Sequence, residues 1–466
     1  TSGDSWSTGW KTPPLAADGF ALPGTEGGWS GVTVTTDRVT RLELVALGLA
    51  GSLPEALGNL TALTVLDLSF NPDLVGEIPA TLGNLTSLES LDLEHCNLTG
   101  HVPGTLGNLT RLEILDLASN RLTGALPVKL GDLAHLTTLS LYSNSFTSIP
   151  AELGNLVNLT KLDLRSNQLG RIPAELGNLT RLTRLDLNTN TSLSGTIPAA
   201  LGNLVQLQYL DLSNTRLSGS IPAELGNLAG LVELNLSHNQ LSGSIPATLG
   251  NLTHLQRLTI GWNQVSGSIP AALGNLTSLR QLHLDKCQLS GSIPAALGGL
   301  ESLTYLVISD TQISGTIPVE LGGVPQLTSL ILSSNRLSGS IPAWLGSMTN
   351  LKDLYLDGNQ FSGSIPAALG TLVNLESLNL SANQLSGSIP AALGNLIKLR
   401  YLNLLGNRLS GSIPTTLTAL TDASFNLHCN ALYSGDSALV AFLNAHAGTW
   451  AATQTVAPTG LSATVL

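Results

Sequence analysis

The 466-residue sequence contains few charged and few aromatic residues. Asp, Glu, Lys and Arg together make up 11% of the chain, against roughly 25% in an average soluble domain, and aromatic residues make up 4%. No apolar run reaches the roughly 18 residues that a membrane-spanning helix needs, so we expect no membrane segment in this chain. Disorder is also excluded, because disordered chains combine high charge with low hydrophobicity and this chain is 42% hydrophobic.

Basic residues and cysteines are scarce too. The chain has 20 Lys and Arg against 31 Asp and Glu, and it has no basic run, so no nucleic-acid footprint is present. Its three cysteines, Cys96, Cys287 and Cys429, have no metal-ligand spacing. No phosphate loop and no nucleophile motif stands out. We therefore expect no enzyme, no cofactor and no metal centre. Because residue 1 is Thr, we expect a processed N-terminus or a fragment of a longer protein.

One phrase recurs from about residue 39 to residue 430, and its copy at 375–398 reads LESLNLSANQLSGSIPAALGNLIK. Its landmark is the Asn, Cys or Thr of LxxLxLxx(N/C/T)xL, which recurs every 24 residues with small drifts. The LxL alternation predicts a short strand with both Leu side chains facing inward. The landmark Asn predicts a ladder of hydrogen bonds to backbone groups, with Cys or Thr as partial substitutes. The segment AxLGNL predicts one helical turn that ends at Gly.

This period and pattern resemble the leucine-rich repeat family over about 85% of the chain, and LSGSIPAxLGNL resembles its plant-type subclass. The resemblance implies an α/β repeat solenoid, a curved superhelix with a parallel concave sheet and a second short sheet at the Gly-Ser-Ile-Pro segment. One repeat cannot bury its own Leu face, so we expect a single continuous solenoid of about sixteen full turns plus a closing one.

The two ends depart from the repeat. We expect an N-terminal cap at 1–38, the solenoid at 39–430, a C-terminal cap at 431–450 and an extended linker or strand at 451–466. The cap would hold a helix over 436–446 that begins at Asp436 or Ser437. Residues 5–34, which begin SWSTGW and end GGWSGVTV, resemble the N-terminal cap of plant-type leucine-rich repeat proteins, without its usual cysteines. The ending APTGLSATV resembles the start of a fibronectin type III domain. Together these features resemble secreted bacterial proteins of the family first, and plant or algal ectodomains next.

A column of acidic residues occupies the position between the two strand Leu residues. It comprises Asp67, Asp92, Asp116, Asp163, Asp186 and Asp211. Such a column could bind Ca²⁺ or a cationic ligand. Asp is also an ordinary residue of the LDLSxN strand, and Ser140 interrupts the column. We prefer this second interpretation and predict no metal site.

Later turns replace the column Asp with other residues, among them His283, Val307, Ile331 and Tyr355. Around these lies the most individual surface of the chain. Exposed aromatic residues beside Arg are typical of binding hot spots and also suit stacking against sugars. The alternative is scattered surface variation. The predicted ligand-binding residues of the concave face are Tyr209, Glu233, His238, Arg257, Trp262, Arg280, His283, Lys286, Tyr305, Asp310, Asp353 and Tyr355.

Glycosylation sequons recur at the Asn of Gly-Asn-Leu-Thr. In a secreted eukaryotic protein several would carry glycans, although this repeat consensus also creates sequons automatically. The candidates are Asn59, Asn84, Asn97, Asn108, Asn158, Asn178, Asn251 and Asn275.

Three functions fit the sequence. We favour a non-enzymatic extracellular or cell-surface scaffold for binding and adhesion, which recognises a protein or glycan on the concave face. The alternatives are a structural subunit that self-assembles into a surface fibre or layer, and the ectodomain of a membrane receptor. The fold does not choose among these functions, because function depends on the sites that the fold carries.

Overall fold

The computed structural model describes residues 30–454 of the chain. They belong to two compact units, an N-terminal unit that ends at Leu241 and a C-terminal unit that begins at Ser242, and each is described by itself. Most of the cap-like segment 5–34 lies before residue 30, and the fibronectin-like ending lies after residue 454. Both resemblances therefore fall largely or wholly outside the described residues.

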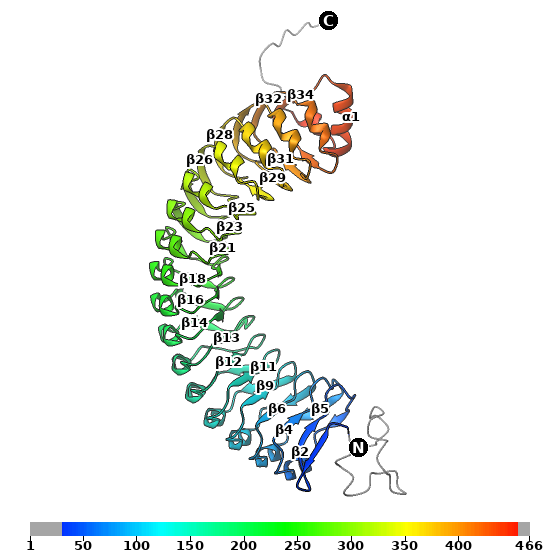
Figure 1. Ribbon diagram of the computed structural model, residues 1–466, viewed down its shortest axis with the longest axis vertical. Helices are drawn as coiled ribbons and strands as arrows, with labels where there is room; N and C mark the ends of the chain where they lie inside the picture. Colours follow the sequence, from blue (N-terminus) through cyan, green and yellow to red (C-terminus); the bar gives the residue numbers. More distant parts are fainter. Residues whose placement is uncertain (1–29, 455–466) are drawn as a thin grey trace. The chain divides into compact units, whose positions relative to one another are not determined.

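In the N-terminal unit, one short strand per turn adds to a sheet whose outward side we call the strand face (Figure 1). The sheet begins with an antiparallel hairpin of β1 (Val32–Thr35) and β2 (Arg38–Glu43). Its turn residues Thr36 and Asp37 both have positive φ, as a tight two-residue hairpin turn requires. The strands that follow in parallel are β4 (Val65–Asp67), β6 (Ser90–Asp92), β8 (Ile114–Asp116), β10 (Thr138–Ser140), β12 (Lys161–Asp163), β13 (Arg184–Asp186), β15 (Tyr209–Asp211) and β17 (Glu233–Asn235).

The C-terminal unit repeats the same arrangement. Its neighbouring strands are all parallel, and they pair residue by residue without a bulge. Its strands are β19 (Arg257–Thr259), β21 (Gln281–His283), β23 (Tyr305–Val307), β25 (Ser329–Ile331), β27 (Asp353–Tyr355), β29 (Ser377–Asn379), β31 (Tyr401–Asn403) and β33 (Ser424–Asn426).

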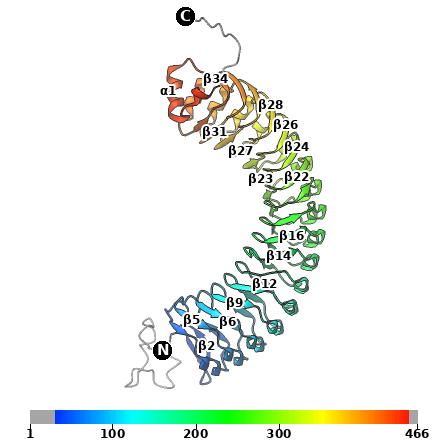
Figure 2. The same ribbon diagram turned by 180° about the vertical axis from the view of Figure 1, so that it is seen from behind.

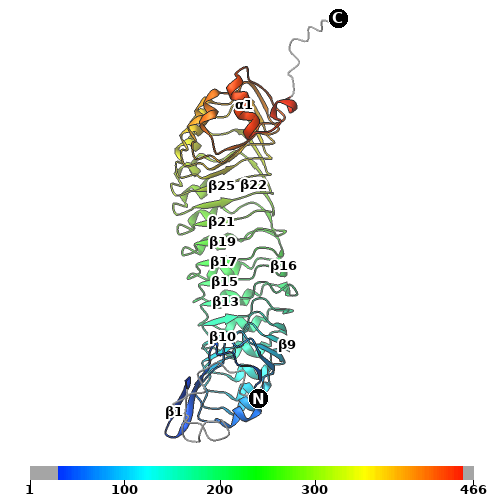
Figure 3. The same cartoon turned by 90° about the vertical axis from the view of Figure 1, so that its right-hand side faces the viewer.

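A second set of short strands forms at the Gly-Ser-Ile-Pro segments, as predicted, and Figure 3 shows it apart from the main strands. In the N-terminal unit these strands are β3 (Gly51–Ser52), β5 (Leu74–Glu77), β7 (Asn97–Gly100), β9 (Arg121–Ala125), β11 (Ser145–Ser148), β14 (Ser194–Thr196) and β16 (Arg216–Ser220). β18 (Gln240–Ser242) contains the boundary between the units. The C-terminal unit has β20 (Ser266–Gly267), β22 (Gln288–Ser292), β24 (Gln312–Gly315), β26 (Arg336–Ser340), β28 (Gln360–Gly363), β30 (Gln384–Gly387), β32 (Arg408–Ser412) and β34 (Ala431–Tyr433).

Each turn also contains a short 3-10 helix that begins after the Pro of Ile-Pro. Those of the N-terminal unit are η4 (Glu55–Asn59), η5 (Ala80–Asn84), η6 (Gly104–Asn108), η7 (Val128–Asp132), η8 (Ala151–Asn155), η9 (Ala174–Asn178), η10 (Ala199–Asn203) and η11 (Ala223–Asn227). Those of the C-terminal unit are η12 (Ala247–Asn251), η13 (Ala271–Asn275), η14 (Ala295–Gly299), η15 (Val319–Gly323), η16 (Ala343–Ser347), η17 (Ala367–Thr371), η18 (Ala391–Asn395) and η19 (Thr415–Ala419).

The prediction that these helical turns end at Gly was wrong by one residue, and the reason is packing. In η5, for example, the helix continues through Gly83 to Asn84. The backbone of Gly83 is not left-handed, but a Cβ atom there would overlap the carbonyl oxygen of Thr105 in the next turn. Glycine is therefore needed at this position because it lets neighbouring turns approach each other closely.

The core is a stack of leucine layers bordered by the predicted ladder of landmark residues. Asn359 is typical of the ladder and is only 8% exposed. Its Oδ1 accepts a hydrogen bond from the N–H of Leu337 at 3.0 Å, and its Nδ2 donates to the carbonyl oxygen of Leu332 at 2.8 Å. The side chain thus satisfies buried backbone groups of the preceding turns, which is the role that the sequence predicted.

The substitutes for Asn satisfy fewer groups, also as predicted. The Sγ of Cys96 donates to the carbonyl oxygen of Leu68 at 3.4 Å. The hydroxyl groups of Thr215 and Thr311 instead donate to the Oδ1 of the landmark Asn one turn later. In these turns, the buried backbone groups therefore depend more on the Asn of the following turn for their hydrogen bonds.

The C-terminal unit ends in a helix and one further ladder residue. Helix α1 (Ser437–His446) lies against β33 and η19 (Figure 2), and the Asp436 side chain caps it by accepting hydrogen bonds from two backbone N–H groups at 2.9 Å. Residues 451–453, where the sequence analysis began an extended linker, belong to the 3-10 helix η20 (Trp450–Thr453). Gln454 follows and takes the place of a landmark Asn, because its Oε1 accepts from the N–H of Leu432 at 3.0 Å.

Candidate ligand-binding surface

Each turn has three side chains that point outward on the strand face. We call the residue before the first buried strand Leu the first column, the residue between the two buried Leu the second column, and the residue after the second Leu the third column. A fourth outward residue, which we call the tip, directly precedes the landmark. Its backbone is left-handed in most turns, with φ near 50–60° at Trp262, Lys286 and Asp310. The fold imposes this conformation, because Ala382, Gly358 and Gly406 hold it as well.

The second column of the C-terminal unit carries an apolar stripe. Val307, Ile331 and Tyr355 occupy consecutive strands in direct register, and all three are half-buried. In the N-terminal unit the same column holds carboxylates. Apolar side chains at these outward positions contribute nothing to the leucine core, so the stripe offers a hydrophobic surface for contact with another molecule.

Exposed aromatic residues and cations lie on the same face, Tyr305 on the first strand of the stripe and the others on the turns of the two preceding strands, β19 and β21. Trp262 is 46% exposed and Tyr305 is 42% exposed. The Lys286 ammonium lies 3.8 Å from the centre of the Trp262 ring, which is cation–π geometry. The Arg257 guanidinium is exposed and donates to Oε1 of Gln281 at 3.0 Å. Together these residues combine large apolar area with positive charge.

The other predicted residues of the C-terminal unit have different surroundings. Arg280 and Asp310 are exposed. His283 is half-buried, and burial lowers the pKa of its imidazole, with a further lowering by Arg257. The carboxylate of Asp353 accepts a hydrogen bond from the Ser329 hydroxyl at 2.6 Å, which fixes it against the sheet.

Three predicted residues, Tyr209, Glu233 and His238, belong to the N-terminal unit, so their position relative to the apolar stripe is not defined. Tyr209 is half-buried and donates to Oδ2 of Asp211 at 3.1 Å. Glu233 is half-buried in the first column, and His238 is an exposed tip residue.

The N-terminal unit instead carries a network of arginines and carboxylates. Arg165 lies 3.7 Å from both Asp163 and Asp186, and Arg184 lies 3.2 Å from Asp186. Burial and the nearby charge of Asp163 together raise the pKa of Asp186 to about 6, although Arg184 opposes the shift. The two arginines therefore compensate only part of the cost of grouping these acids on one face.

Both arginines also stack on tyrosine rings. The Arg165 guanidinium carbon lies 4.4 Å from the ring centre of Tyr142, and that of Arg184 lies 3.7 Å from the ring centre of Tyr209. Stacking and ion pairing from both sides hold these side chains in defined places. This part of the strand face is a preorganised polar surface.

A separate acidic cluster lies nearer the start of the N-terminal unit. Asp92 and Asp116 belong to the second column, and Glu94 belongs to the third. Burial, with smaller effects from the charges of Asp116, Asp67 and Glu94, raises the pKa of Asp92 to about 7. The hydroxyl of Tyr142, two strands away, donates to Oε1 of Glu94.

The sequence analysis missed Glu94, Tyr142 and Arg165 as site residues. All three occupy the third column, which the LxL pattern does not mark because it stops at the second Leu. Extending the same alternation by one step would have placed them outward.

The sequon residues divide into two groups. Asn97 and Asn158 are half-buried, and each donates a side-chain hydrogen bond to a carbonyl oxygen, that of Pro72 or of Ala134. The exposed residues, each at the end of a 3-10 helix, are Asn59, Asn84, Asn108, Asn178, Asn251 and Asn275.

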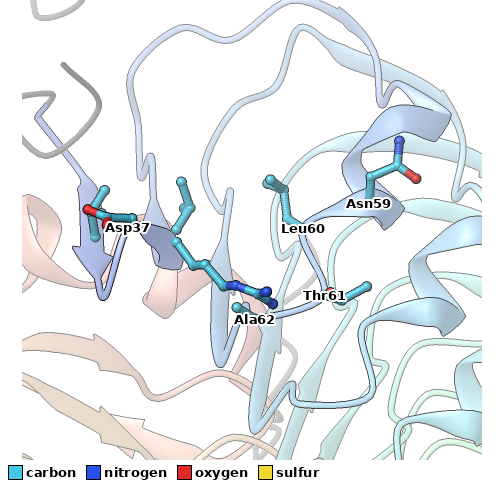
Figure 4. A pocket seen from close by; sticks show the side chains of 8 residues that line it. Asp37, Asn59, Leu60, Thr61 and Ala62 are labelled. Carbon is cyan, nitrogen blue, oxygen red and sulfur yellow. The ribbon is translucent and has the colours of Figure 1, made fainter. Parts of the chain in front are cut away.

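Figure 4 shows a hollow beside the β1–β2 hairpin, with Asp37 on the hairpin side and Asn59, Leu60 and Thr61 on the other. It includes none of the predicted ligand-binding residues. Within residues 30–454, no helix combines the length and the apolar character needed to cross a bilayer.

A turn-by-turn stack of strand, landmark ladder and 3-10 helix defines a repeat solenoid, and the chain belongs to the leucine-rich repeat family. The leucine-rich repeat region pattern matches residues 196–303 and 279–428, and shorter leucine-rich repeat patterns match 87–109, 110–169 and 157–217.

Solved structures from plants and bacteria are similar to this chain. It is 36% identical to the plant peptide hormone receptor RGFR1 in complex with RGF2, with a TM-score of 0.73, covering 84% of this chain and 71% of the receptor chain. It is 34% identical to a TDR receptor, with a TM-score of 0.79, covering 84% of this chain and 68% of that one. It is 32% identical to a leucine-rich repeat protein of Leptospira interrogans, with a TM-score of 0.66, covering 83% and 95%.

Proposed function

We propose that this chain is the non-enzymatic ligand-binding part of an extracellular or cell-surface protein, and that the strand face of its C-terminal unit binds a peptide or a protein segment. The apolar stripe of Val307, Ile331 and Tyr355 carries this proposal. Tyr305, on the first strand of the stripe, and Trp262, in the turn two strands before it, add exposed aromatic area of the kind that dominates binding energy at protein interfaces. The cations Lys286 and Arg257 favour a ligand with acidic groups beside its apolar residues.

The similar receptors support a peptide ligand over a sugar. The plant peptide hormone receptor RGFR1 was solved in complex with RGF2, and it is 36% identical to this chain over the aligned part. A glycan remains the alternative ligand, because the same aromatic rings could stack on a sugar. Self-assembly through residues 451–466 concerns a segment that lies mostly outside the described residues.

Selection from a displayed random peptide library tests the proposal. The decisive variant combines Trp262→Ala with Tyr305→Ser. Each substitution introduces the residue that another turn holds at the same position, Ala382 at the tip and Ser329 in the first column, so the fold should be kept. Tyr433→Ala is the matched control, because Tyr433 is 63% exposed but lies on the second sheet.

We expect peptides selected on the wild type to lose at least about 30-fold in affinity for the double variant, the effect of one hot spot of about 2 kcal/mol. They should bind the Tyr433→Ala control unchanged. Peptides that bind all three proteins equally would refute the assignment of this surface. If the library yielded no peptide, and a glycan array instead yielded a sugar that binds the wild type but not the double variant, the ligand class would be refuted and the surface kept.

A further inference from the structure

Three carboxylates converge at one place on the N-terminal unit. One oxygen each from Asp92, Glu94 and Asp116 lies within 4.8 Å of the other two. The Oδ1 of Asp92 accepts the N–H of Glu94 at 2.9 Å, and the Oδ1 of Asp116 accepts the N–H of Ala118 at 2.9 Å. These bonds orient both Asp side chains and leave each a second oxygen for another ligand.

Ser140 provides an independent sign of a missing ligand. It lies next to Asp116 in the second column and is fully buried. Its Oγ makes no hydrogen bond of normal length and angle within the described part of the chain, although it lies close enough to the Asp116 carboxylate to lower the pKa of that group as a weak hydrogen-bond donor. An unpaired buried hydroxyl costs about 1–3 kcal/mol, so such groups usually have a partner such as an ion or a bound water.

Charge compensation differs sharply along the column. Farther along, Arg165 and Arg184 pair with Asp163 and Asp186. Among residues 30–454, no Lys, Arg or His forms an ion pair with any of the three converging carboxylates. The neutral Tyr142 hydroxyl donates to Oε1 of Glu94 and leaves Oε2. The cluster therefore carries more negative than positive charge, and the sheet holds its three side chains close together.

We propose that Asp92, Glu94 and Asp116 bind one Ca²⁺ ion, with the Ser140 hydroxyl and water completing its coordination. Two oxygens bound to the same Ca²⁺ can be up to about 5 Å apart, twice the Ca–O distance. The three carboxylate oxygens lie within 4.8 Å of one another, so one Ca²⁺ ion can bind all of them. With three carboxylates at a half-exposed site, we expect a Kd on the order of 0.1–1 mM, the range of extracellular calcium modules.

Terbium luminescence tests the proposal, since Tb³⁺ replaces Ca²⁺ at oxygen sites and emits when a nearby tyrosine is excited. Tyr142 touches Glu94 and should sensitise the ion. Titration of the full chain with terbium chloride should give saturable emission that calcium chloride displaces and magnesium chloride displaces much less. Tyr142→Phe should abolish the emission while calorimetry still detects Ca²⁺ binding.

Two variants distinguish a specific Ca²⁺ site from nonspecific attraction of cations to the acidic column. Glu94→Gln keeps an acceptor for Tyr142 but removes a ligand charge, so it should weaken Ca²⁺ binding at least about tenfold. Asp211→Asn removes a charge from the same column outside the cluster and should leave binding within about twofold. Equal losses in both variants, or no saturable binding up to about 10 mM Ca²⁺, would overturn the proposal. Circular dichroism of each variant checks that its fold is retained.

Discussion

The landmark ladder makes a strong prediction about stability at Asn359. Replacing Asn359 with Ala leaves the N–H of Leu337 buried without its partner. The carbonyl oxygen of Leu332 loses one of two donors, because it still accepts from Nδ2 of Asn335 at 3.1 Å. The stranded N–H costs about 1–3 kcal/mol, so the free energy of unfolding should fall by roughly that amount. Urea denaturation followed by circular dichroism measures this loss. Native-state hydrogen exchange should show that the Leu337 amide in particular loses protection.

A matched substitution controls for the loss of an amide side chain. Asn350 is in the same unit and donates one hydrogen bond to the carbonyl oxygen of Pro325 at 2.8 Å, but it is exposed. Water can replace that bond, so Asn350→Ala should cost less than about 1 kcal/mol. If Asn359→Ala also cost less than 1 kcal/mol, or if the two variants were equally destabilised, the ladder would not hold the turns together as described.

Two further predictions concern titratable groups. Cys429 is exposed while Cys96 and Cys287 are buried, and burial raises the pKa of the Cys287 thiol to about 11, so iodoacetamide at neutral pH should label only Cys429 in the folded protein. Mass spectrometry locates the label, and rapid labelling of Cys287 would contradict the burial. For Asp186, the folded pKa of about 6 exceeds the ordinary 3.8, so its contribution to stability is full below pH 4 and is lost as the pH rises through 6. Asp186→Asn should therefore flatten the fall of the unfolding free energy between these pH values, and an unchanged slope in urea titrations would refute this.

The sequence alone predicted the repeat correctly because each turn solves the same packing problem. Leucine spacing fixed the strands, and the landmark Asn fixed the ladder, down to the weaker role of Cys96. The pattern could not show that the Gly of Gly-Asn-Leu is there for close packing, because that requirement arises between turns. It also did not reveal Gln454 as a ladder residue, since Gln breaks the Asn pattern while offering the same amide group.

The candidate sites were predictable only in part. The acid column was visible in the sequence, but its division into an arginine-paired stretch and an unpaired cluster depends on side chains from other turns. Tyr142 reaches Glu94 across 48 residues of sequence. Such contacts follow from the stacking of turns, which brings residues two repeats apart within reach of one another.

Calorimetric titration of a selected peptide against Val307→Thr with Ile331→Asn tests the role of the apolar stripe most directly. These substitutions insert the residues that Thr259 and Asn379 already supply in the same column and unit, so strand pairing and the core should be unaffected. If the stripe is the contact surface, affinity should fall at least about tenfold, because roughly 1.4 kcal/mol of apolar contact is removed, while the melting temperature stays within error. Unchanged affinity in a fully folded variant would show that the ligand binds elsewhere.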